Sequence, residues 1–331
     1  MRLRRADPSG PGYTRRRRGK GFSYADQHGR PLTDPDELGR IRALAIPPAW
    51  RDVWICPDPR GHIQAVGTDA AGRRQYRYHN LWRVKRDRDK FDHVLDVAER
   101  LPALRERVHD DLSAGRGPTR PRVLATAVRL LDLGVFRVGG EAYANEEGPG
   151  EASYGLATLR RDHVTLRGSA MEFRYPAKGG VERAVRVVDP QIAPVVRALL
   201  RRPDDHPELL AYRAGRTTWR DVRSADINAY LREVTACEIS AKDFRTWHAT
   251  VLAAVELAGP RASAARSPTA RKRAVGAAMR EVAEYLGNTP AVARASYVDP
   301  RVVDLYDAGT TVAPALAAGE EPEPAVLALL R

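Results

Sequence analysis

Cysteine is scarce in this sequence. The chain has 331 residues and only two cysteines, Cys56 and Cys237, which are far apart. Two thiols cannot supply the four ligands of a structural zinc site, and a disulfide framework needs more cysteines than this. The composition therefore predicts no metal centre and a location in the reducing cytoplasm.

Long apolar runs are missing as well. No stretch approaches the roughly 18 apolar residues that are needed to span a bilayer. The chain starts with the letters MRLRR and continues with polar residues, so it lacks the apolar core of a secretory leader. We expect no membrane segment. Hydrophobic residues still make up 43% of the chain, which is ordinary for a globular protein with a sizeable core.

Acidic residues are outnumbered by basic ones. The chain has 55 lysines and arginines against 42 aspartates and glutamates, which gives a formal net charge of +13. Residues 1–92 hold most of the excess, with 21 basic and 11 acidic side chains. Basic surfaces release condensed counterions from phosphate backbones, so the charge favours a nucleic-acid partner. A basic enzyme of another kind, or a ribosome-associated protein, would show the same balance.

The pattern of residues divides the chain into four parts. Residues 1–20, with consecutive arginines at 15–18, are typical of a flexible basic arm. Residues 21–92 have short β-compatible runs between prolines and glycines, which predicts a small antiparallel β domain. Residues 93–311 have mainly helical periodicity. The tail, residues 312–331, is predicted to be poorly ordered.

Two features interrupt the helical part. A β interlude at 160–188 contains a predicted hairpin, and helices are expected from about 190 to 308. Residues 259–273 are rich in Ala, Arg, Ser and Pro and indicate a basic linker. The fold class is therefore α+β, with a β-rich N-terminal domain before a mainly helical one.

An arginine and a lysine each lie beside glycines in predicted turns. Arg137 belongs to the motif FRVGGE, just after a helix that is expected to stop at Gly134. Lys178 belongs to FRYPAKGG and is expected at the tip of the hairpin. A guanidinium can grip a phosphate, and a mobile ammonium can donate a proton. For each residue taken alone, a solvated surface role is the favoured interpretation.

A second arginine opens an apolar helix. Arg245 lies in the motif KDFRTWHA, where Asp243 or Thr246 is a candidate helix cap. The N-terminus of a helix favours phosphate, and the guanidinium adds to that field. His248, one turn further on, is as compatible with a structural hydrogen bond as with catalysis.

A tyrosine closes the last motif, YLGNTPAVARASYVDP at residues 285–300. Gly287 is expected to end one helix, and Thr289 with Pro290 to start another. That helix should end near Tyr297, before the next proline. One short helix therefore separates Asn288 from Tyr297.

These four motifs, in this order, resemble the type IB DNA topoisomerases, especially the compact poxvirus-like and bacterial members. The resemblance covers nearly the whole chain, and it includes AIPPAW at 45–50, YRYH at 76–79 and SYGLATL at 153–159. It implies a small N-terminal antiparallel β domain that clamps DNA. It also implies a mainly helical catalytic domain, of the kind shared with tyrosine recombinases, that includes a β-hairpin.

The resemblance also implies a role for each motif residue. Arg137 and Arg245 match the two catalytic arginines, Lys178 matches the lysine that protonates the leaving 5′ oxygen, and Tyr297 matches the nucleophile. The implied activity is relaxation of supercoiled duplex DNA through a 3′-phosphotyrosyl intermediate, strand rotation and religation, without ATP, metal or cofactor. The implied acting unit is a monomer on duplex DNA, in the cytoplasm at the nucleoid.

The chain departs from the family pattern at two places. Asn288 stands where poxvirus-like members have histidine; an amide can donate to a phosphate oxygen but carries no full positive charge. We count Asn288 in the catalytic set and expect the difference to alter the rate, not the reaction. Residues 145–152 form an acidic segment that looks longer than usual.

Four residues are candidates for DNA contacts near the cut: Tyr76, Arg77, Tyr78 and Tyr143. On a strand, Tyr76 and Tyr78 share one face and Arg77 points to the other. Packing between elements would account for the tyrosines equally well.

Three other functions remain open at this point. A tyrosine recombinase shares the Arg, Lys, Arg and Tyr set, but it carries His-x-x-Arg and Leu-Gly-His, and here Lys242 and Asn288 occupy the histidine positions. A basic architectural protein would explain the charge but not the ordered motifs. A metal-dependent nuclease would need clustered carboxylates, which the sequence does not offer.

Overall fold

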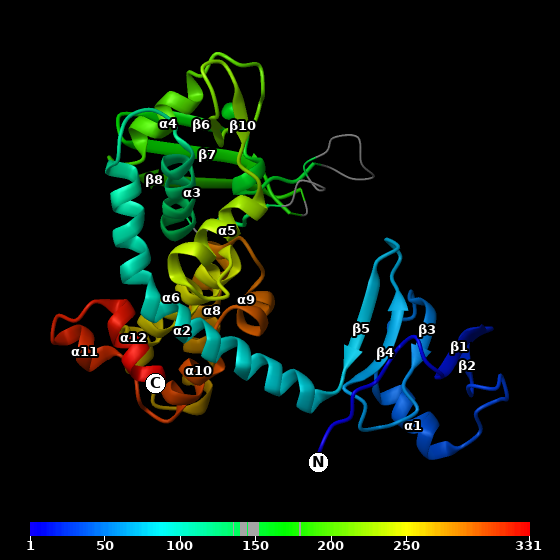
Figure 1. Cartoon of the computed structure of the whole chain (residues 1–331). Helices are drawn as coiled ribbons and strands as arrows, with labels where there is room; N and C mark the ends of the chain where they lie inside the picture. Colours follow the sequence, from blue (N-terminus) through cyan, green and yellow to red (C-terminus); the bar gives the residue numbers. More distant parts are fainter. Residues whose placement is uncertain (135, 140–143, 145–151, 179) are drawn as a thin grey trace. The chain divides into compact units, whose positions relative to one another are not determined.

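The computed structural model describes residues 1–134, 136–139, 144, 152–178 and 180–331. It contains two compact units, Met1–Asp92 and His93–Arg331 (Figure 1). Tyr143 and residues 145–151 of the acidic segment lie outside the described residues.

The N-terminal unit is built on a five-stranded antiparallel sheet. Its strands follow the order β2-β1-β3-β4-β5 in space. A helix, α1 (Pro35–Ala43), packs Ile41 against Val53, Ile55 and Ala65 to form the core of the unit. The antiparallel β domain predicted from the sequence is therefore confirmed. The strands are β1 (Tyr13–Arg18), β2 (Gly21–Ala25), β3 (Arg51–Ile55), β4 (Ile63–Thr68) and β5 (Arg74–Tyr78).

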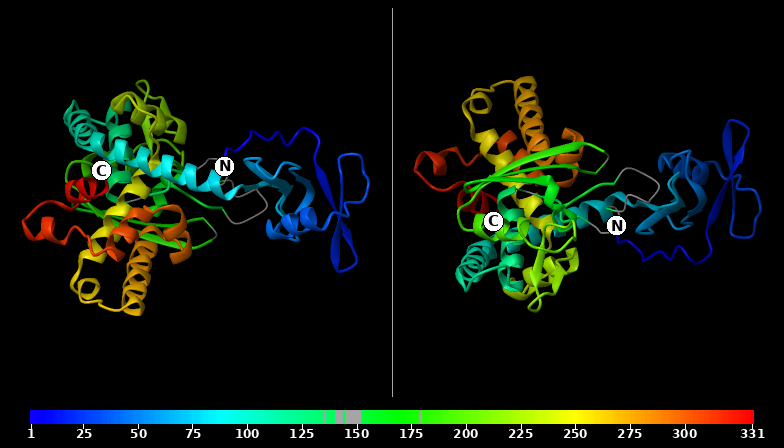
Figure 2. Two further views of the ribbon diagram at one scale, coloured as in Figure 1. Left: turned by 90° about the horizontal axis from the view of Figure 1, so that it is seen from below. Right: turned by 90° about the horizontal axis from the view of Figure 1, so that it is seen from above.

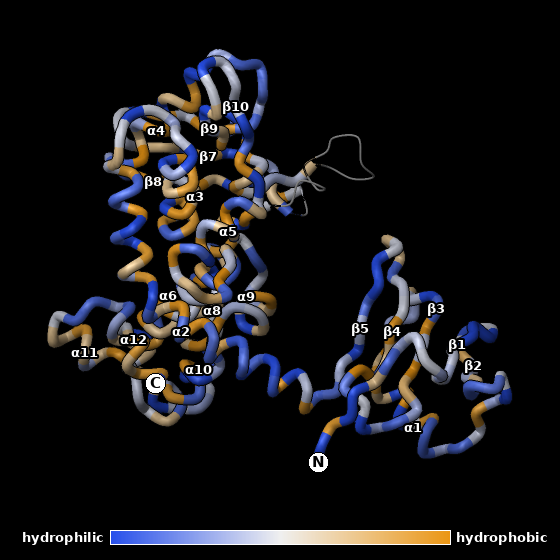
Figure 3. The backbone as a smooth tube through the Cα atoms, viewed as in Figure 1, coloured by the Kyte–Doolittle hydropathy of each residue, from blue (hydrophilic) through white to orange (hydrophobic). Residues whose placement is uncertain are grey.

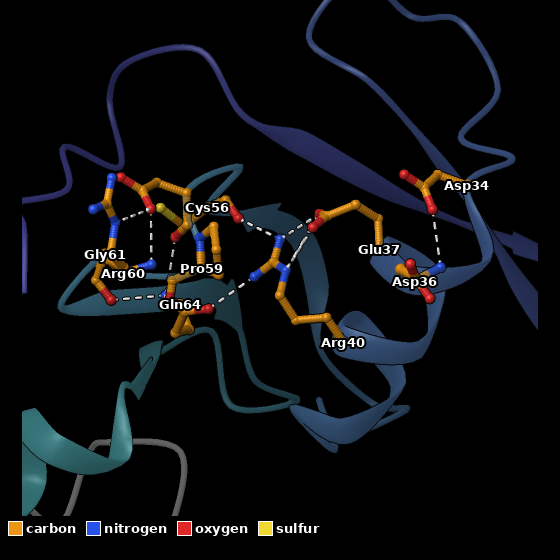
Figure 4. Close-up of polar contacts among 10 residues, drawn as sticks. Asp34, Asp36, Glu37, Arg40, Cys56, Pro59, Arg60, Gly61 and Gln64 are labelled. Carbon is orange, nitrogen blue, oxygen red and sulfur yellow. Dashed lines mark hydrogen bonds and ion pairs between the residues drawn. The ribbon is translucent and has the colours of Figure 1, made fainter. Parts of the chain in front are cut away.

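Arg40 holds helix α1 on this sheet (Figure 4). Its guanidinium donates to the Gln64 side chain and to the Cys56 carbonyl, each at 2.8 Å, and pairs with Glu37 at 2.8 Å. Gln64 is buried and its amide donates to the Gly61 carbonyl at 2.7 Å. Charge-assisted hydrogen bonds of this kind fix the helix and the β3–β4 connection together.

The arginine run is not a flexible arm; this prediction was wrong. Residues 13–18 form β1, which pairs with β2 and β3. Arg15 donates to the backbone carbonyls of Ile46, Pro47 and Trp50 at 2.7–3.2 Å and lies 4.1 Å over the Phe22 ring. A run of four arginines suggested a solvated segment. In the structure the Arg15 side chain binds backbone carbonyls, and the pattern of charges does not reveal that contact.

The C-terminal unit is mainly helical around one large core. It contains a three-stranded antiparallel sheet, ordered β6-β7-β8, and a short pair, β9 and β10. None of the described helices is long and apolar enough to cross a membrane. The long helix α2 (Asn80–Ser113) starts in the N-terminal unit. The other elements are α3 (Arg120–Gly134), η2 (Leu156–Thr158), η3 (Arg161–His163), β6 (Val164–Arg167), β7 (Ala170–Pro176), β8 (Glu182–Val188), α4 (Ala193–Leu200), β9 (Ala211–Arg213), β10 (Trp219–Asp221), α5 (Ser224–Thr235), α6 (Ala241–Ala258), α7 (Pro260–Ser263), α8 (Pro268–Leu286), α9 (Pro290–Ser296), α10 (Pro300–Asp307), α11 (Ala313–Ala317) and α12 (Pro322–Leu330).

Helix α6 forms the centre of this unit. Most of its side chains are buried, including Phe244, Trp247 and Leu257. It contacts α3, α7, α8, α10 and α12. Because α6 begins with the motif that carries Arg245, the core itself positions that residue. The mainly helical domain with a β-hairpin is therefore confirmed.

Several predicted boundaries differ from the structure. Helix α2 starts at Asn80, before residue 93, because the His79 ring accepts the Leu81 amide. Its first half is mostly hydrophilic, so it carries no apolar periodicity (Figure 3). Strands β9 and β10 interrupt the region expected to be helical, and the supposed linker at 259–273 contains α7 and the start of α8.

The tail is ordered, against the prediction. Residues 313–317 and 322–330 form α11 and α12, drawn in red in Figures 1 and 2. Val326 is fully buried. Glu323 pairs with Arg105 of α2 at 2.7 Å. The proline and glutamate content suggested disorder. Composition does not show that Val326 is buried or that Glu323 pairs with the distant Arg105.

A partly buried charge network, with the carboxylate of Asp132 at its buried centre, joins four helices at this place. Arg105 also pairs with Asp132 of α3 at 2.8 Å, and the His248 ring lies 3.1 Å from the same carboxylate. Burial raises the pKa of Asp132, but hydrogen bonds from His248 and Arg105 outweigh it and hold that pKa far below its usual value. His248 therefore acts as a structural partner of Asp132.

We expect Asp132→Asn to lower the free energy of unfolding by about 3 kcal/mol at neutral pH, because it removes one member of a buried pair. Chemical denaturation would measure this. The depressed pKa makes the carboxylate stabilising above its unfolded pKa of about 3.9. The difference from wild type should therefore shrink as the pH falls below about 4.

Asp96→Asn is the matched control. Asp96 pairs with Arg331 at 2.7 Å, but the two side chains are 53% and 41% exposed. An exposed pair contributes about 0–1 kcal/mol. Equal losses from the two substitutions would contradict a special role for the buried network.

Candidate active site

Arg137 follows α3 in a segment that is held by a second loop. The Leu156 amide donates to the Arg137 carbonyl at 2.8 Å. Gly139 adopts φ +80°, and a Cβ there would lie 2.8 Å from the Gly155 Cα. Only glycine permits this approach. The close approach of Gly139 to Gly155 therefore helps to fix the backbone that follows Arg137.

The turn between α8 and α9 is set by Gly287. This residue follows α8 in the left-handed conformation with φ +61°, and the next amide, of Asn288, reaches back to the Ala283 carbonyl at 2.8 Å. Such a cap satisfies carbonyls at the end of a helix. Thr289 then caps α9 by accepting from the Val292 amide. The helix stop and restart lie where the sequence predicts them.

Three consecutive carbonyls at this turn each accept a hydrogen bond from an arginine. The arginines come from β8, from α6 and from the segment after α3, so three distant parts of the chain converge on the end of α8. The negative end of the helix dipole favours cations there. The three pairs are Arg183 with Tyr285 (2.5 Å), Arg245 with Leu286 (2.9 Å) and Arg137 with Gly287 (3.4 Å).

Asn288 is bound to Arg137 through its side chain. The Arg137 guanidinium donates to the Asn288 amide oxygen at 2.5 Å. The amide nitrogen of the same side chain is buried and has no hydrogen-bond partner among the described residues. Asn288 therefore orients Arg137 through its amide oxygen, and its amide nitrogen could donate to a bound phosphate.

Tyr297 ends α9 beside Arg245. The centre of the Arg245 guanidinium lies 5.2 Å from the centroid of the tyrosine ring. Thr250 of α6 fixes the backbone: its hydroxyl lies 3.3 Å from the Tyr297 carbonyl and accepts from the Asp299 amide at 3.1 Å. Both contacts come from α6, so the core helix places the phenol and its cation together.

The charges of the site act on the tyrosine. Burial raises the pKa of Tyr297, but the charge and hydrogen bond of Arg245, with Arg137 and Lys242, outweigh it and leave that pKa below its usual value. Burial lowers the pKa of Arg245 to about 10, with Tyr297 opposing and Arg137 assisting the shift. Arg245 thus remains a cation at neutral pH, and the phenolate is favoured.

The structure brings Arg137, Arg245, Asn288 and Tyr297 together through these contacts. Lys178 is exposed in the β7–β8 turn, as the sequence predicts. Within the described part of the chain, no hydrogen bond or ion pair links it to the other four. Its place in the site therefore stays a prediction.

The candidate DNA contacts lie on β5. Tyr76 and Tyr78 are exposed on one face with their rings stacked at 5.9 Å. Arg77 points to the other face and donates to the Ala45 carbonyl at 2.6 Å. The alternation is as predicted, but the tyrosines and the arginine do not form one surface. Contact with DNA stays a prediction, and Tyr143 lies outside the described residues.

One group of possible metal ligands occurs elsewhere. His206, Glu208 and Asp221 have ligand atoms within 4.8 Å of one another, near β9 and β10. This group shares no residue with the site around Tyr297.

Residues 79–308 match the family described as the catalytic core of eukaryotic DNA topoisomerase I. The chain belongs to the type IB DNA topoisomerases. Residues 21–69 match the N-terminal domain of bacterial DNA topoisomerase IB. A curated relative, DNA topoisomerase 1B of Acanthamoeba polyphaga mimivirus, is 28% identical over 304 residues, which cover 89% of this chain and 87% of the relative.

The family membership decides between the functions left open by the sequence. It supports a type IB enzyme in place of a recombinase, an architectural protein or a metal-dependent nuclease. The resemblance stated from the four motifs is therefore confirmed at the level of the family.

Sequence reasoning missed Lys242 and Thr250 of this topoisomerase site, among other residues. Lys242 lies three positions before Arg245 on α6, on the same face of the helix, and that spacing could have indicated it. Thr250 had no signal, because its contact with Tyr297 joins residues 47 positions apart.

Asn288→Ala is expected to slow single-turnover DNA cleavage roughly 10- to 100-fold, because Arg137 loses its acceptor and the site loses a donor. Asn288→Asp keeps the acceptor but replaces the donor by a negative oxygen, so we expect it to be slower still. Rates on a suicide duplex would be compared, with thermal melts to check folding. Aspartate at the wild-type rate would show that the amide donor contributes nothing.

Proposed function

We propose that this chain relaxes supercoiled duplex DNA by cutting one strand with Tyr297, allowing rotation and resealing the strand, without ATP or metal. The observation that carries the proposal is the half-buried Tyr297 phenol beside the buried Arg245 guanidinium, with Arg137 bound to the neighbouring turn. This arrangement lowers the pKa of the phenol and gathers positive charge where a phosphate would bind.

The cleavage step needs a nucleophile, stabilisation of the charge on the phosphate, and a proton for the leaving oxygen. Tyr297 first loses its phenolic proton to water. The phenolate oxygen then attacks the phosphorus, a new 3′-phosphotyrosyl bond forms, and the bond to the 5′ oxygen breaks. Arg137 and Arg245 stabilise the charge that builds on the two non-bridging oxygens, and the Asn288 amide adds a donor. Arginine suits this task because it is planar and stays charged.

The leaving oxygen must take up a proton. A sugar alkoxide is a strong base, so an acid is needed as the bond breaks. We assign this role to Lys178 on the hairpin turn. In the reverse step the 5′ hydroxyl returns the proton to Lys178 and displaces the tyrosine. Because the phosphotyrosyl bond keeps the energy of the phosphodiester, religation needs no ATP.

DNA binding extends beyond the cut in this proposal. The N-terminal unit would grip the duplex, with the exposed rings of Tyr76 and Tyr78 as contacts. Arg77 and Tyr143 remain candidates on sequence grounds. One copy of the chain is proposed to act on duplex DNA at the nucleoid.

The first test is relaxation of supercoiled plasmid in excess EDTA without ATP, with wild type and Tyr297→Phe side by side. We expect relaxation by wild type only, because phenylalanine lacks the attacking oxygen. Trapping with denaturant should give a covalent DNA adduct of the wild type alone. An adduct formed by Tyr297→Phe would refute the nucleophile, and wild-type activity lost in EDTA would refute the metal-free mechanism.

The pH dependence of cleavage offers a second test. Because the pKa of Tyr297 lies below its usual value, the single-turnover rate should rise with pH and level off below about pH 10. Lys242→Ala removes a cation that lowers this pKa, so the rise should move to higher pH.

Lys20→Ala, in the turn between β1 and β2, is the control for charge alone. It should leave the position of the rise unchanged. A rise that does not move in Lys242→Ala would mean that the nucleophile is not the group that titrates.

A further inference from the structure

Arg183 connects the hairpin that carries Lys178 with the end of helix α8. It lies on β8, five residues after Lys178, directly opposite Tyr175 of β7. Its guanidinium donates to the Tyr285 carbonyl at 2.5 Å and reaches the Glu284 carbonyl at 3.4 Å. These carbonyls belong to the last turn of α8, where a cation is favoured by the helix dipole.

The contact is close as well as polar. A Cβ added to Gly287 would lie 2.5 Å from a nitrogen of the Arg183 guanidinium. The guanidinium therefore packs directly on the residue that precedes Asn288. The left-handed conformation of Gly287 requires glycine in any case, and the absent side chain leaves the room that Arg183 occupies.

The other strand of the hairpin, β7, contacts the segment that carries Arg137. Tyr175 is buried, and its ring stacks on Phe136 with centroids 6.1 Å apart. Burial raises the pKa of Tyr175, while Arg183, Arg245 and Arg137 each oppose that shift. The end of the hairpin next to its turn thus lies near Arg137 and Arg245, the two arginines that also act on Tyr297.

We propose that Arg183 is a positioning residue that fixes the hairpin, and with it Lys178, against the turn carrying Asn288. The inference rests on the proposed roles of Lys178 and Tyr297. Strand β6 pairs only with residues 170–173 of β7, so from residue 174 to the turn the hairpin has two strands. Two paired strands are only marginally stable on their own, so this end of the hairpin needs an anchor. A misplacement of about 1 Å can cost a catalytic group about 100-fold in rate. The guanidinium reaches two carbonyls with a rigid planar fork, whereas an ammonium is a point charge on a flexible stem.

The test separates positioning of Lys178 from every other effect. It uses duplex DNA in which sulfur replaces the bridging 5′ oxygen at the cut. A thiol has a pKa of about 8.5, against about 16 for water, so the sulfur leaves without a proton donor. Lys178→Ala should be slow on ordinary DNA and close to wild type on the sulfur substrate.

We expect Arg183→Ala to follow the same pattern. Its single-turnover cleavage of ordinary DNA should fall at least about 10-fold, and its rate on the sulfur substrate should return to within about threefold of wild type. Arg183→Lys, which keeps the charge but loses the planar fork, should cleave ordinary DNA at a rate between wild type and Arg183→Ala and should recover equally on the sulfur substrate. This conservative variant keeps the test valid if the alanine variant does not fold.

Arg186→Ala is the matched control. Arg186 lies on the same strand with its side chain exposed on the opposite face, so this variant removes the same charge and should cleave both substrates at wild-type rates. Equal slowing of Arg183→Ala on both substrates, with Lys178→Ala rescued, would overturn the inference. Failure of sulfur to rescue Lys178→Ala would instead refute the proposed role of Lys178, and Arg183 would lose its function with it.

Discussion

The end of helix α8 is the place on which the site depends. Gly287 turns the chain out of the helix, and the carbonyls of residues 285, 286 and 287 are each taken by a guanidinium from a different part of the fold. Three cations held close together repel one another. Backbone carbonyls at the negative end of a helix offset that repulsion without adding a carboxylate. The cations therefore remain available to a phosphate.

At this turn, backbone carbonyls accept from Arg183, Arg245 and Arg137. A carboxylate partner would neutralise Arg245 and would repel an incoming phosphate. The Leu286 carbonyl anchors Arg245 at 2.9 Å and leaves its charge intact. The buried carboxylate of Asp132 instead pairs with His248 and Arg105. Helix α6 thus carries the Arg245 cation beside Tyr297 and a structural ion network at His248.

Much of this site follows from sequence, because its parts are local. The stop at Gly287, the cap at Thr289 and the position of Tyr297 at the end of a short helix depend on neighbouring residues. The contacts of Arg183 and Thr250 join residues 102 and 47 positions apart, so no local pattern reveals them. The fold class was predictable for the same reason, whereas the order of the tail depends on the distant partner Arg105.

Not every basic side chain of the N-terminal unit is available to a nucleic acid. The guanidiniums of Arg15 and Arg77 both donate hydrogen bonds to backbone carbonyls of the loop at residues 45–50. That loop carries the AIPPAW motif. Arg15 and Arg77 therefore stabilise the fold of the unit, while residues 16–18 remain exposed on β1. A net charge predicts a polyanionic partner but does not say which side chains meet it.

Asn288 is the remaining departure from the poxvirus-like pattern, and the geometry gives it a physical meaning. An imidazolium has two donors and no acceptor. The amide of Asn288 accepts from Arg137 through its oxygen and keeps a buried nitrogen donor that no described residue takes. Asparagine therefore exchanges a positive charge for the ability to orient the neighbouring arginine. In a site that already gathers Arg137, Arg183 and Arg245 at one turn, orientation of a cation is worth more than the addition of another.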